Sequence, residues 1–296
     1  MHENCSVHST TKKEPKAGPF TREPKSRFYA GPIRHHFLEW NPEGRPTLVL
    51  VHGASANAWW WESVASAIAP RLRLLALDLR GHGDSEWARP PAYRPEHYAA
   101  DLARFIEATT SAPPIVVGHS MGGIVALACA CAYPRRQRAV VAIDLALTSS
   151  DERNRYLRRL RALPKVVYPD FETAKRRFRL MPDEGTIDAG LVARIAERSV
   201  RPAAGGGFTF KFDRESFFGG DGLDVMEAVR QIQVPLLLVR GEKSRIMTAD
   251  AATRALRINP RTRLKAVAHG HHHLPLEHPA ALARIIESFA REHAGR

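Results

Sequence analysis

Gly118-His119-Ser120-Met121-Gly122 is the stretch of sequence that decides the fold. It follows an apolar run at 115–117, which is typical of a short buried strand, and precedes residues 123–130, which are typical of a helix packed on that strand. Glycines on either side of the central residues allow a sharp strand-to-helix turn that holds the serine side chain out at the top of a sheet. This context favours an exposed nucleophile at Ser120 over a plain glycine-rich turn.

A second apolar run, at residues 47–51, ends in His52-Gly53-Ala54-Ser55. A glycine directly after a central strand lets the backbone turn so that its N–H groups point into a site. In acyl transfer the tetrahedral oxyanion needs two such donors, usually one from this loop and one from the residue after the nucleophile. We therefore expect the backbone N–H groups of Ala54 and Met121 to form an oxyanion hole.

A third apolar run leads into the loop at residues 79–85. Short polar side chains in such loops commonly cap neighbouring backbone groups. We interpret this loop as a turn that is held by Asp84 and Ser85.

With these motifs the chain resembles the α/β-hydrolase superfamily. The matching motifs are the His52-Gly53 loop, residues 78–85, the Ser120 turn and the His272 segment, and their order and spacing fit the family from about residue 33 to residue 292. The resemblance implies an open, mostly parallel sheet with helices on both faces and catalytic groups on loops at the carboxyl ends of the strands. The alternation of strand-like and helical stretches predicts the same α/β class.

A serine needs a base to remove its proton, and residues 268–279 offer a row of histidines. Relatives place their catalytic histidine a short, fixed distance before an acidic residue and a proline that begin the last helix. Counting back from Glu277 and Pro279 selects His272, whereas a count that stresses the preceding glycine selects His271.

The same histidines raise the alternative of a metal site, because clustered histidines bind zinc or nickel. Adjacent histidines on an extended loop point in different directions, however, and no cysteine or carboxylate cluster completes a ligand set. We expect no metal and no cofactor.

The acid that orients the base departs from the common pattern. Most relatives carry an aspartate just after the strand that corresponds to residues 235–241, but here Glu242-Lys243-Ser244-Arg245 follows it. Some members of the superfamily take the acid from the end of the strand after the nucleophile helix, which here ends in Asp144. We expect Asp144 to be the acid, with Glu242 as the alternative. The other interpretation of Asp144 is a carboxylate that only caps its loop and takes no part in catalysis.

Composition divides the chain into three parts. Residues 1–26 are polar and basic and are interpreted as a disordered leader. Residues 27–147 and 227–296 form the expected hydrolase core, and residues 148–226, rich in arginine with leucine and isoleucine at helical spacing, form the helical cap that hydrolases of this type insert over the site. Residues 59–61, three consecutive tryptophans, are expected in the pocket wall or in the core.

Length and composition set further bounds. A chain of 296 residues that is 44% hydrophobic can bury a full core. It has no apolar run long enough to span a membrane and no visible secretory signal, and the cysteines Cys5, Cys129 and Cys131 form no disulfide framework. We expect Cys129 and Cys131 to be inert core thiols in a cytoplasmic protein.

The net charge of +13 raises the question of nucleic-acid binding. The arginines are scattered along helix faces between acidic residues, and no nucleic-acid motif accompanies them, so we expect no nucleic-acid partner. A solvated cap surface accounts for the charge, and the alternative is that part of it steers anionic substrates such as carboxylates. The oligomeric state stays open.

These residues predict a serine hydrolase that cleaves a carboxylic ester or related acyl compound through an acyl-enzyme. The same constellation serves a carbon–carbon bond hydrolase or an acyltransferase. A non-catalytic receptor or scaffold on this fold is the alternative of another class, and it would gain support if Asp144 and Glu242 both lay far from the histidine.

Overall fold

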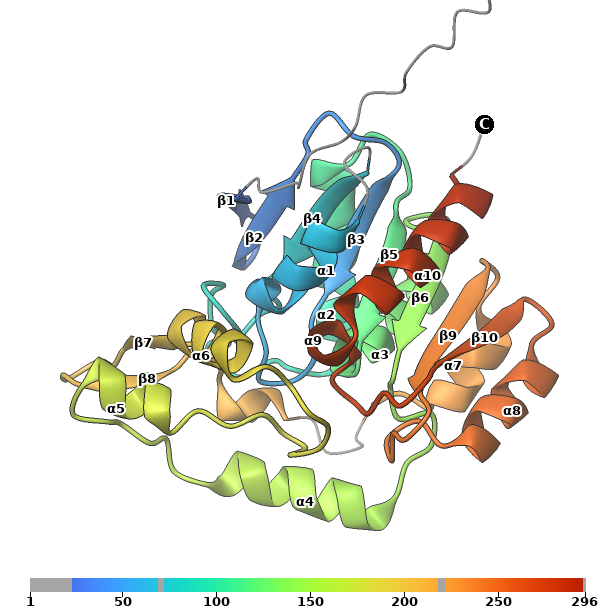
Figure 1. Ribbon diagram of the computed structural model, residues 1–296. Helices are drawn as coiled ribbons and strands as arrows, with labels where there is room; N and C mark the ends of the chain where they lie inside the picture. The colour runs from blue at the N-terminus through green and yellow to red at the C-terminus, as the bar shows by residue number, and fades with distance from the viewer. Residues whose placement is uncertain (1–22, 69–71, 218–221, 295–296) are drawn as a thin grey trace, which may run out of the picture.

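An eight-stranded sheet forms the centre of the computed structural model, which describes residues 23–68, 72–217 and 222–294 (Figure 1). The strand order is β1-β2-β4-β3-β5-β6-β9-β10; β1 and β2 are antiparallel to their neighbours, and every other pair is parallel. The strands are β1 (Lys25–Ala30), β2 (Arg34–Trp40), β3 (Thr47–Val51), β4 (Arg73–Leu77), β5 (Ile115–His119), β6 (Ala139–Ile143), β9 (Leu236–Gly241) and β10 (Thr262–Val267). The expected mostly parallel sheet is confirmed.

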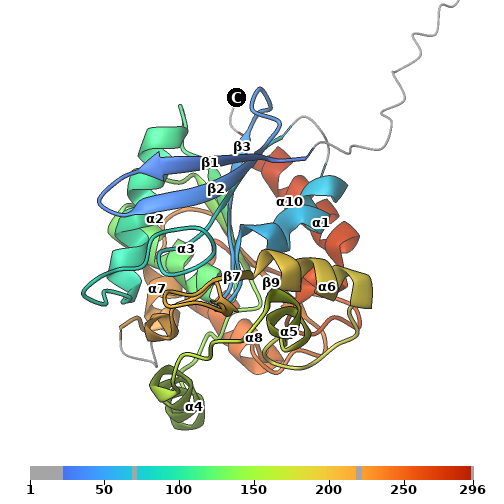
Figure 2. The same ribbon diagram turned by 90° about the vertical axis from the view of Figure 1, so that its left-hand side faces the viewer.

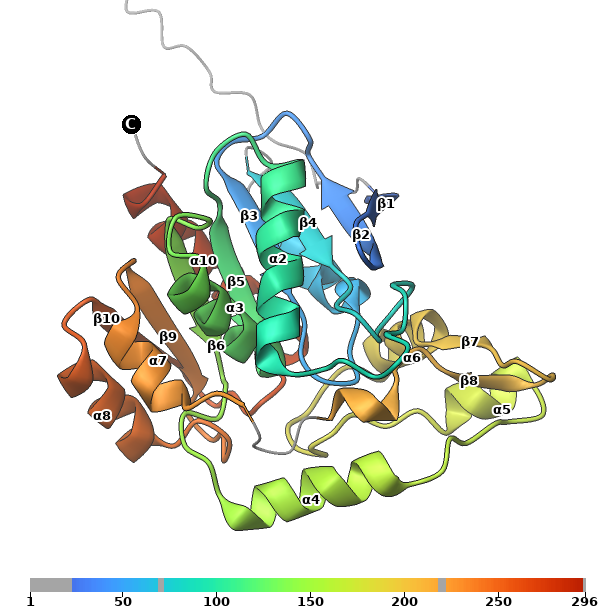
Figure 3. The same ribbon diagram turned by 180° about the vertical axis from the view of Figure 1, so that it is seen from behind.

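Helices cover both faces of this sheet (Figures 1 and 3). The central strands are continuous apolar runs because neither of their faces meets water. One face packs against α1 (Glu62–Ala67) and α10 (Pro279–Glu292), and the 3₁₀ helix η1 (Ala58–Trp61) and the short α9 (Leu274–Glu277) lie beside them. The other face packs against α2 (Pro95–Thr109), α3 (Met121–Ala132), α7 (Val225–Gln231) and α8 (Ala249–Ile258).

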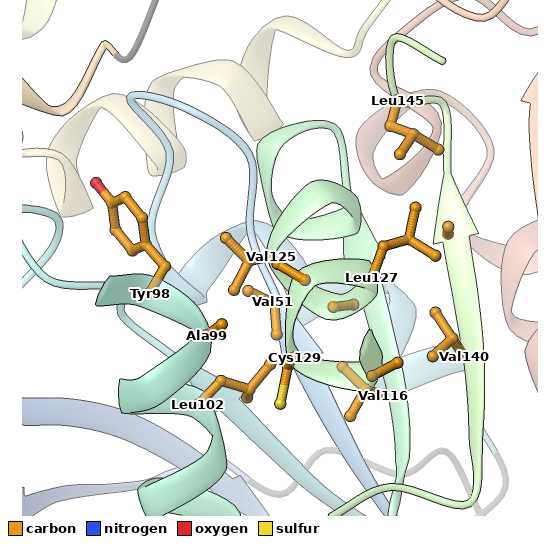
Figure 4. Close-up of a cluster of buried hydrophobic side chains, with 14 of the residues drawn as sticks. Val51, Tyr98, Ala99, Leu102, Val116, Val125, Leu127, Cys129, Val140 and Leu145 are labelled. Carbon is orange, nitrogen blue, oxygen red and sulfur yellow. The ribbon is translucent and has the colours of Figure 1, made fainter. Parts of the chain in front are cut away.

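The core under α2 and α3 is drawn in Figure 4, where side chains from both helices meet those of the strands. Tyr98 and Leu102 of α2 and Cys129 of α3 belong to this core, and all three are fully buried. Cys129 and Cys131 are free thiols, and burial raises the pKa of Cys129 to about 12. A thiol that stays protonated is a weak nucleophile, so Cys129 is a packing residue.

Between β6 and α7 the chain leaves the sheet and forms a separate layer beyond the carboxyl ends of the strands (Figures 1 and 2). We call residues 148–224 the insertion. Its elements are α4 (Asp151–Ala162), α5 (Phe171–Arg176), α6 (Ala189–Arg198), β7 (Val200–Pro202), β8 (Phe208–Phe210) and the 3₁₀ helix η2 (Arg214–Ser216). Besides its helices, the insertion contains an antiparallel β7–β8 hairpin that the helical spacing did not predict.

Two expected boundaries differ from the structure. The cap was expected to end at residue 226, but α7 begins at Val225 and buries this side chain in the core under α2 and α3. Residues 1–22 of the expected leader lie outside the described residues, while β1 begins at Lys25, so residues 25–26 belong to the sheet edge. Among the described residues, the helices are too short or too polar to cross a membrane.

Candidate active site

Ser120 occupies the tight turn between β5 and α3. Its backbone has a positive φ of 53° with ψ −119°, a conformation that residues other than glycine rarely adopt. The glycines around it are required by close approach: a Cβ on Gly118 would lie 2.2 Å from the Gly122 carbonyl oxygen, and one on Gly122 would lie 2.2 Å from that of Val51. The sequence around Ser120 therefore forms the strained strand-to-helix turn that it predicted.

His272 and Asp144 come together from segments far apart in the chain. Asp144 follows β6, its side chain is completely buried, and its Oδ2 accepts a hydrogen bond from Nδ1 of His272 at 2.7 Å. Because a carboxylate only accepts, Nδ1 carries a proton, and in the neutral ring the lone pair lies on Nε2. His272 and Ser120 line the same cavity. The condition that would have favoured a non-catalytic protein, an acid far from the histidine, is not met.

The two alternative residues have other partners. His271 lies on the loop that leads into α9, and its Nδ1 is 3.1 Å from Oε2 of Glu277. Oε2 of Glu242 accepts a hydrogen bond from the backbone N–H of His269 at 3.0 Å. Neither His271 nor Glu242 contributes to the cavity wall that contains Ser120.

Ser244 is a site residue that the sequence analysis did not assign. Its hydroxyl donates to Oδ2 of Asp144 at 2.5 Å, and the backbone N–H of Gly241 lies 3.3 Å from Oδ1. Ser244 lies in the segment after β9 where the family resemblance led us to look for the acid, and its hydroxyl supports the carboxylate that follows β6. One signal for this role of Ser244 was visible in the sequence, because a serine stands in the segment where an aspartate was expected.

His119 fixes the backbone of the histidine loop. Its Nε2–H donates to the carbonyl oxygen of His272 at 2.8 Å, and burial lowers its pKa well below the usual value, so the ring is neutral. The strand that carries the nucleophile is thus tied to the loop that carries the base. Nothing in the sequence indicated that His119 makes this hydrogen bond instead of only packing in the core.

Ala54 and Met121, the expected oxyanion donors, both line the cavity. Met121 is the first residue of α3, where a helix provides no carbonyl for the backbone N–H. The loop that carries Ala54 is held by His52, whose Nδ1–H donates to the Gly53 carbonyl at 2.7 Å and whose Nε2 accepts from the Leu79 N–H at 3.0 Å. Burial lowers the pKa of His52, which keeps the ring neutral and able to make both bonds.

Loop 79–85 is held differently from the prediction. Ser85 caps the backbone as expected, since its hydroxyl donates to the Asp78 carbonyl at 2.7 Å. Asp84 does not: its carboxylate pairs with Lys211 of the insertion at 2.7 Å, and only its backbone N–H takes part in the turn, donating to Asp78 Oδ2. The buried Asp78 carboxylate also accepts from the Ala58 N–H at 2.6 Å, so Asp78 is the residue that holds this loop.

A cavity of about 850 Å³ is lined both by residues of the insertion and by residues of the loops that follow the strands. The three tryptophans separate: Trp60 lines the cavity, Trp61 is completely buried in the core, and Trp59 lies under the guanidinium of Arg198 at 4.1 Å. The wall is mainly apolar, which suits the carbon chain of a small organic substrate.

Three buried histidines could hold a metal ion at this cavity. One ring nitrogen from each of His119, His272 and His273 lies within 4.8 Å of the other two. A metal there would occupy the histidine that is bound to Asp144, so it would compete with proton transfer. The expectation that the protein needs no metal stays a prediction.

Comparisons with known proteins agree with this architecture. A sequence model of the alpha/beta hydrolase family matches residues 48–285. The chain is similar to 2-(acetamidomethylene)succinate hydrolase of Mesorhizobium japonicum, at 27% identity over 82% of this chain and 87% of that protein, and to the pimeloyl-[acyl-carrier protein] methyl ester esterase of Yersinia enterocolitica, at 27% identity over 86% and 98%. A solved structure of E-2-(acetamidomethylene)succinate hydrolase superimposes with a TM-score of 0.80 at 26% identity, over 90% of this chain and 99% of that one. The chain belongs to the alpha/beta hydrolase family and is a hydrolase.

Proposed function

We propose that the protein is a serine hydrolase that cleaves a small carboxylic ester or related acyl compound through an acyl-enzyme. The observation that carries the proposal is that Ser120, in its strained turn, lines the same mainly apolar cavity as His272, which is hydrogen-bonded to Asp144. A hydroxyl, a base with a free Nε2 and a buried carboxylate are the groups that this chemistry requires.

In the proposed acylation step, the Ser120 oxygen attacks the substrate carbonyl carbon while Nε2 of His272 takes the hydroxyl proton. Asp144 keeps the proton on Nδ1 and stabilises the imidazolium that forms. The N–H groups of Ala54 and Met121 donate to the oxyanion, whose charge develops only as the tetrahedral intermediate forms. His272 then gives its proton to the leaving alcohol, and the carbon–oxygen bond to that alcohol breaks.

In the deacylation step, a water molecule loses a proton to His272 and attacks the acyl-enzyme, which releases the carboxylic acid and restores Ser120. The insertion excludes bulk water during the reaction and shapes the acyl pocket. We assign this reaction to the cytoplasm, as expected from the composition and the free thiols.

Labelling with a fluorophosphonate probe, followed by mass spectrometry, tests this proposal. We expect stoichiometric modification of Ser120 in the wild-type protein, no modification in Ser120→Ala and slower modification in Asp144→Asn. Glu242→Gln is the matched control and should label at the wild-type rate, because Glu242 contacts the His269 backbone instead of His272. A folded wild-type protein that resists the probe would overturn the acyl-enzyme mechanism.

A further inference from the structure

One face of α4 lines the cavity although the helix contributes nothing to the core. Arg153, Tyr156, Leu157 and Leu160 are lining residues, and their spacing places them along a single face of a helix. No residue of α4 is buried. The face therefore meets the substrate space instead of the protein interior, and Arg153 is its charged member.

Arg153 is a partly buried cation whose charge is not matched. Its Nη1 donates to the Thr148 carbonyl at 2.7 Å, and within the described residues its guanidinium has no carboxylate partner. Burial lowers the pKa of Arg153, the direction expected for a cation that has lost water without gaining an anion. The remaining donors of the guanidinium are available to a ligand in the cavity.

A second arginine borders the same cavity from the sheet side. Arg254 of α8 is an exposed lining residue with no ion-pair partner among the residues described. The N-terminal end of α4, where Arg153 lies, is on the α8 side of the molecule (Figure 1). Asp224 is the single carboxylate among the described lining residues, and it already caps α7 by accepting from the Glu227 N–H at 3.0 Å.

We propose that Arg153, assisted by Arg254, binds a carboxylate group of the substrate, so that the preferred substrates are acyl compounds with a second, ionised carboxyl group. This inference rests on the proposed function and defines its substrate class. Guanidinium groups bind carboxylates through two parallel hydrogen bonds, and such charge-assisted bonds are strong where water is excluded. Leu157, Leu160 and Met181 line the cavity as well and provide an apolar wall for the carbon chain between the two groups.

Two matched series of methyl esters test the proposal. The monomethyl esters of succinate, glutarate, adipate and pimelate carry a terminal carboxylate, and the straight-chain methyl esters of the same chain length end in a methyl group. We expect kcat/KM of the wild-type protein to be at least about tenfold higher for one or more of the anionic esters than for the neutral ester of equal length.

Variants of α4 assign the effect to a residue. Arg153→Gln should lower kcat/KM for the preferred anionic ester by about ten- to hundredfold while changing the neutral ester less than about threefold, and Arg153→Lys should recover part of the loss. Arg155→Gln removes the same charge from an exposed position on the same helix outside the cavity wall, so it should affect neither series. Equal losses in Arg153→Gln and Arg155→Gln would indicate long-range steering and would overturn the site.

A binding measurement separates this inference from the proposed function. Ser120→Ala cannot form an acyl-enzyme, so the preferred anionic ester should bind to it intact, and calorimetry should show at least about tenfold weaker binding when Arg153→Gln is added. If the probe labels Ser120 but the two ester series react and bind equally well, the carboxylate site is wrong and the hydrolase stands. If Arg153-dependent binding is found without labelling or turnover, the acyl-enzyme mechanism is wrong and the carboxylate site stands.

Discussion

The carboxyl edge of the sheet and the α4 helix face each other across one cavity, yet they are built in opposite ways. At the sheet edge, the Asp144 carboxylate is completely buried and each of its oxygens has a hydrogen-bond donor nearby. The α4 helix has no buried residue, and Arg153 faces the cavity without a carboxylate partner in the described chain. We infer that the fixed geometry of the sheet edge serves the reacting atoms and that the unmatched Arg153 serves the part of the substrate that varies.

The adjacent histidines give the largest expected effect and test the sheet edge directly. We expect His272→Ala to lower kcat by about 10⁴- to 10⁶-fold, because the serine would lose the base that removes its proton. His271→Ala removes a ring that contacts Glu277 instead of Asp144, and we expect a change of less than about tenfold. Steady-state kinetics on one ester suffices, with the unfolding midpoints of both variants as the control. Comparable losses in the two variants would contradict the assignment of the base.

The two candidate acids give the next largest expected effect. Asp144→Asn keeps the size of the side chain but can stabilise the wrong tautomer of His272, so we expect kcat to fall by about 10³- to 10⁴-fold. Glu242→Gln should leave kcat unchanged within about threefold, because that side chain bonds to the loop backbone. A larger loss in Glu242→Gln than in Asp144→Asn would move the acid to the segment after β9 and break the contrast between a fixed edge and an open insertion.

Sequence was sufficient for the fold and for the local turn at Ser120, because both depend on short patterns. A buried strand, a pair of glycines and a helix follow one another directly in the chain, and each leaves its mark within a few residues. For the three tryptophans, the sequence predicted only that they lie in the pocket wall or in the core. Whether Trp60 or Trp61 faces the cavity depends on the rotation of η1, and three identical residues give no pattern that fixes it.

The Asp144–His272 contact was predicted from the family resemblance, but other contacts between distant segments were not predicted from the sequence. Ser244 and Asp144 are separated by the whole insertion, and their hydrogen bond arises because β6 and β9 are neighbours in the sheet. Asp84 was expected to cap its own loop, but Lys211 of the insertion lies within reach and an opposite charge is the stronger partner. A single sequence carries no record of which distant residues form such pairs.

The insertion itself has an anchored end, which offers a smaller test. Asp213 is buried, and its backbone N–H donates to the Gly81 carbonyl of loop 79–85 at 2.7 Å. Its Oδ2 accepts from the Tyr93 hydroxyl at 2.7 Å and from Arg89 at 2.6 Å. Asp213→Asn should lower the free energy of unfolding by about 2 kcal/mol, since two bonds to a charged acceptor are weakened. Glu215→Gln disrupts an exposed pair with Arg161 and should cost less than about 1 kcal/mol.

Urea unfolding of both variants, with hydrogen exchange across residues 208–217, measures this difference. Faster exchange in Asp213→Asn than in Glu215→Gln would locate the anchor at the contacts of Asp213 with Arg89 and Tyr93. Equal stability and equal exchange would mean that the insertion is held elsewhere, and the contrast between its anchored end and the exposed α4 would fail.

The last test concerns pH and loop 79–85, whose Gly81 carbonyl accepts from the Asp213 backbone N–H. His82 lies in loop 79–85, its backbone pairs with Phe212 of the insertion, and burial, followed by the nearby His52, lowers its pKa to about 3. In the unfolded chain the pKa is about 6.5, so between about pH 3 and pH 6.5 the unfolded state binds one more proton than the folded state. The contribution of this residue to stability is therefore complete above about pH 6.5 and is lost as the pH falls towards 3.

Replacing His82 should flatten the acid side of the stability curve. We expect His82→Gln to reduce the slope of the unfolding free energy against pH by up to about 1.4 kcal/mol per unit between pH 4 and pH 6, whatever its stability at pH 7. His269→Asn is the matched control, because His269 is exposed and asparagine tolerates its positive φ of 59°. Urea titrations at pH 4, 5, 6 and 7 give the slopes. An unchanged slope in His82→Gln would show that the ring takes up a proton in the folded protein, and the loop between the sheet edge and the insertion would then be open to water.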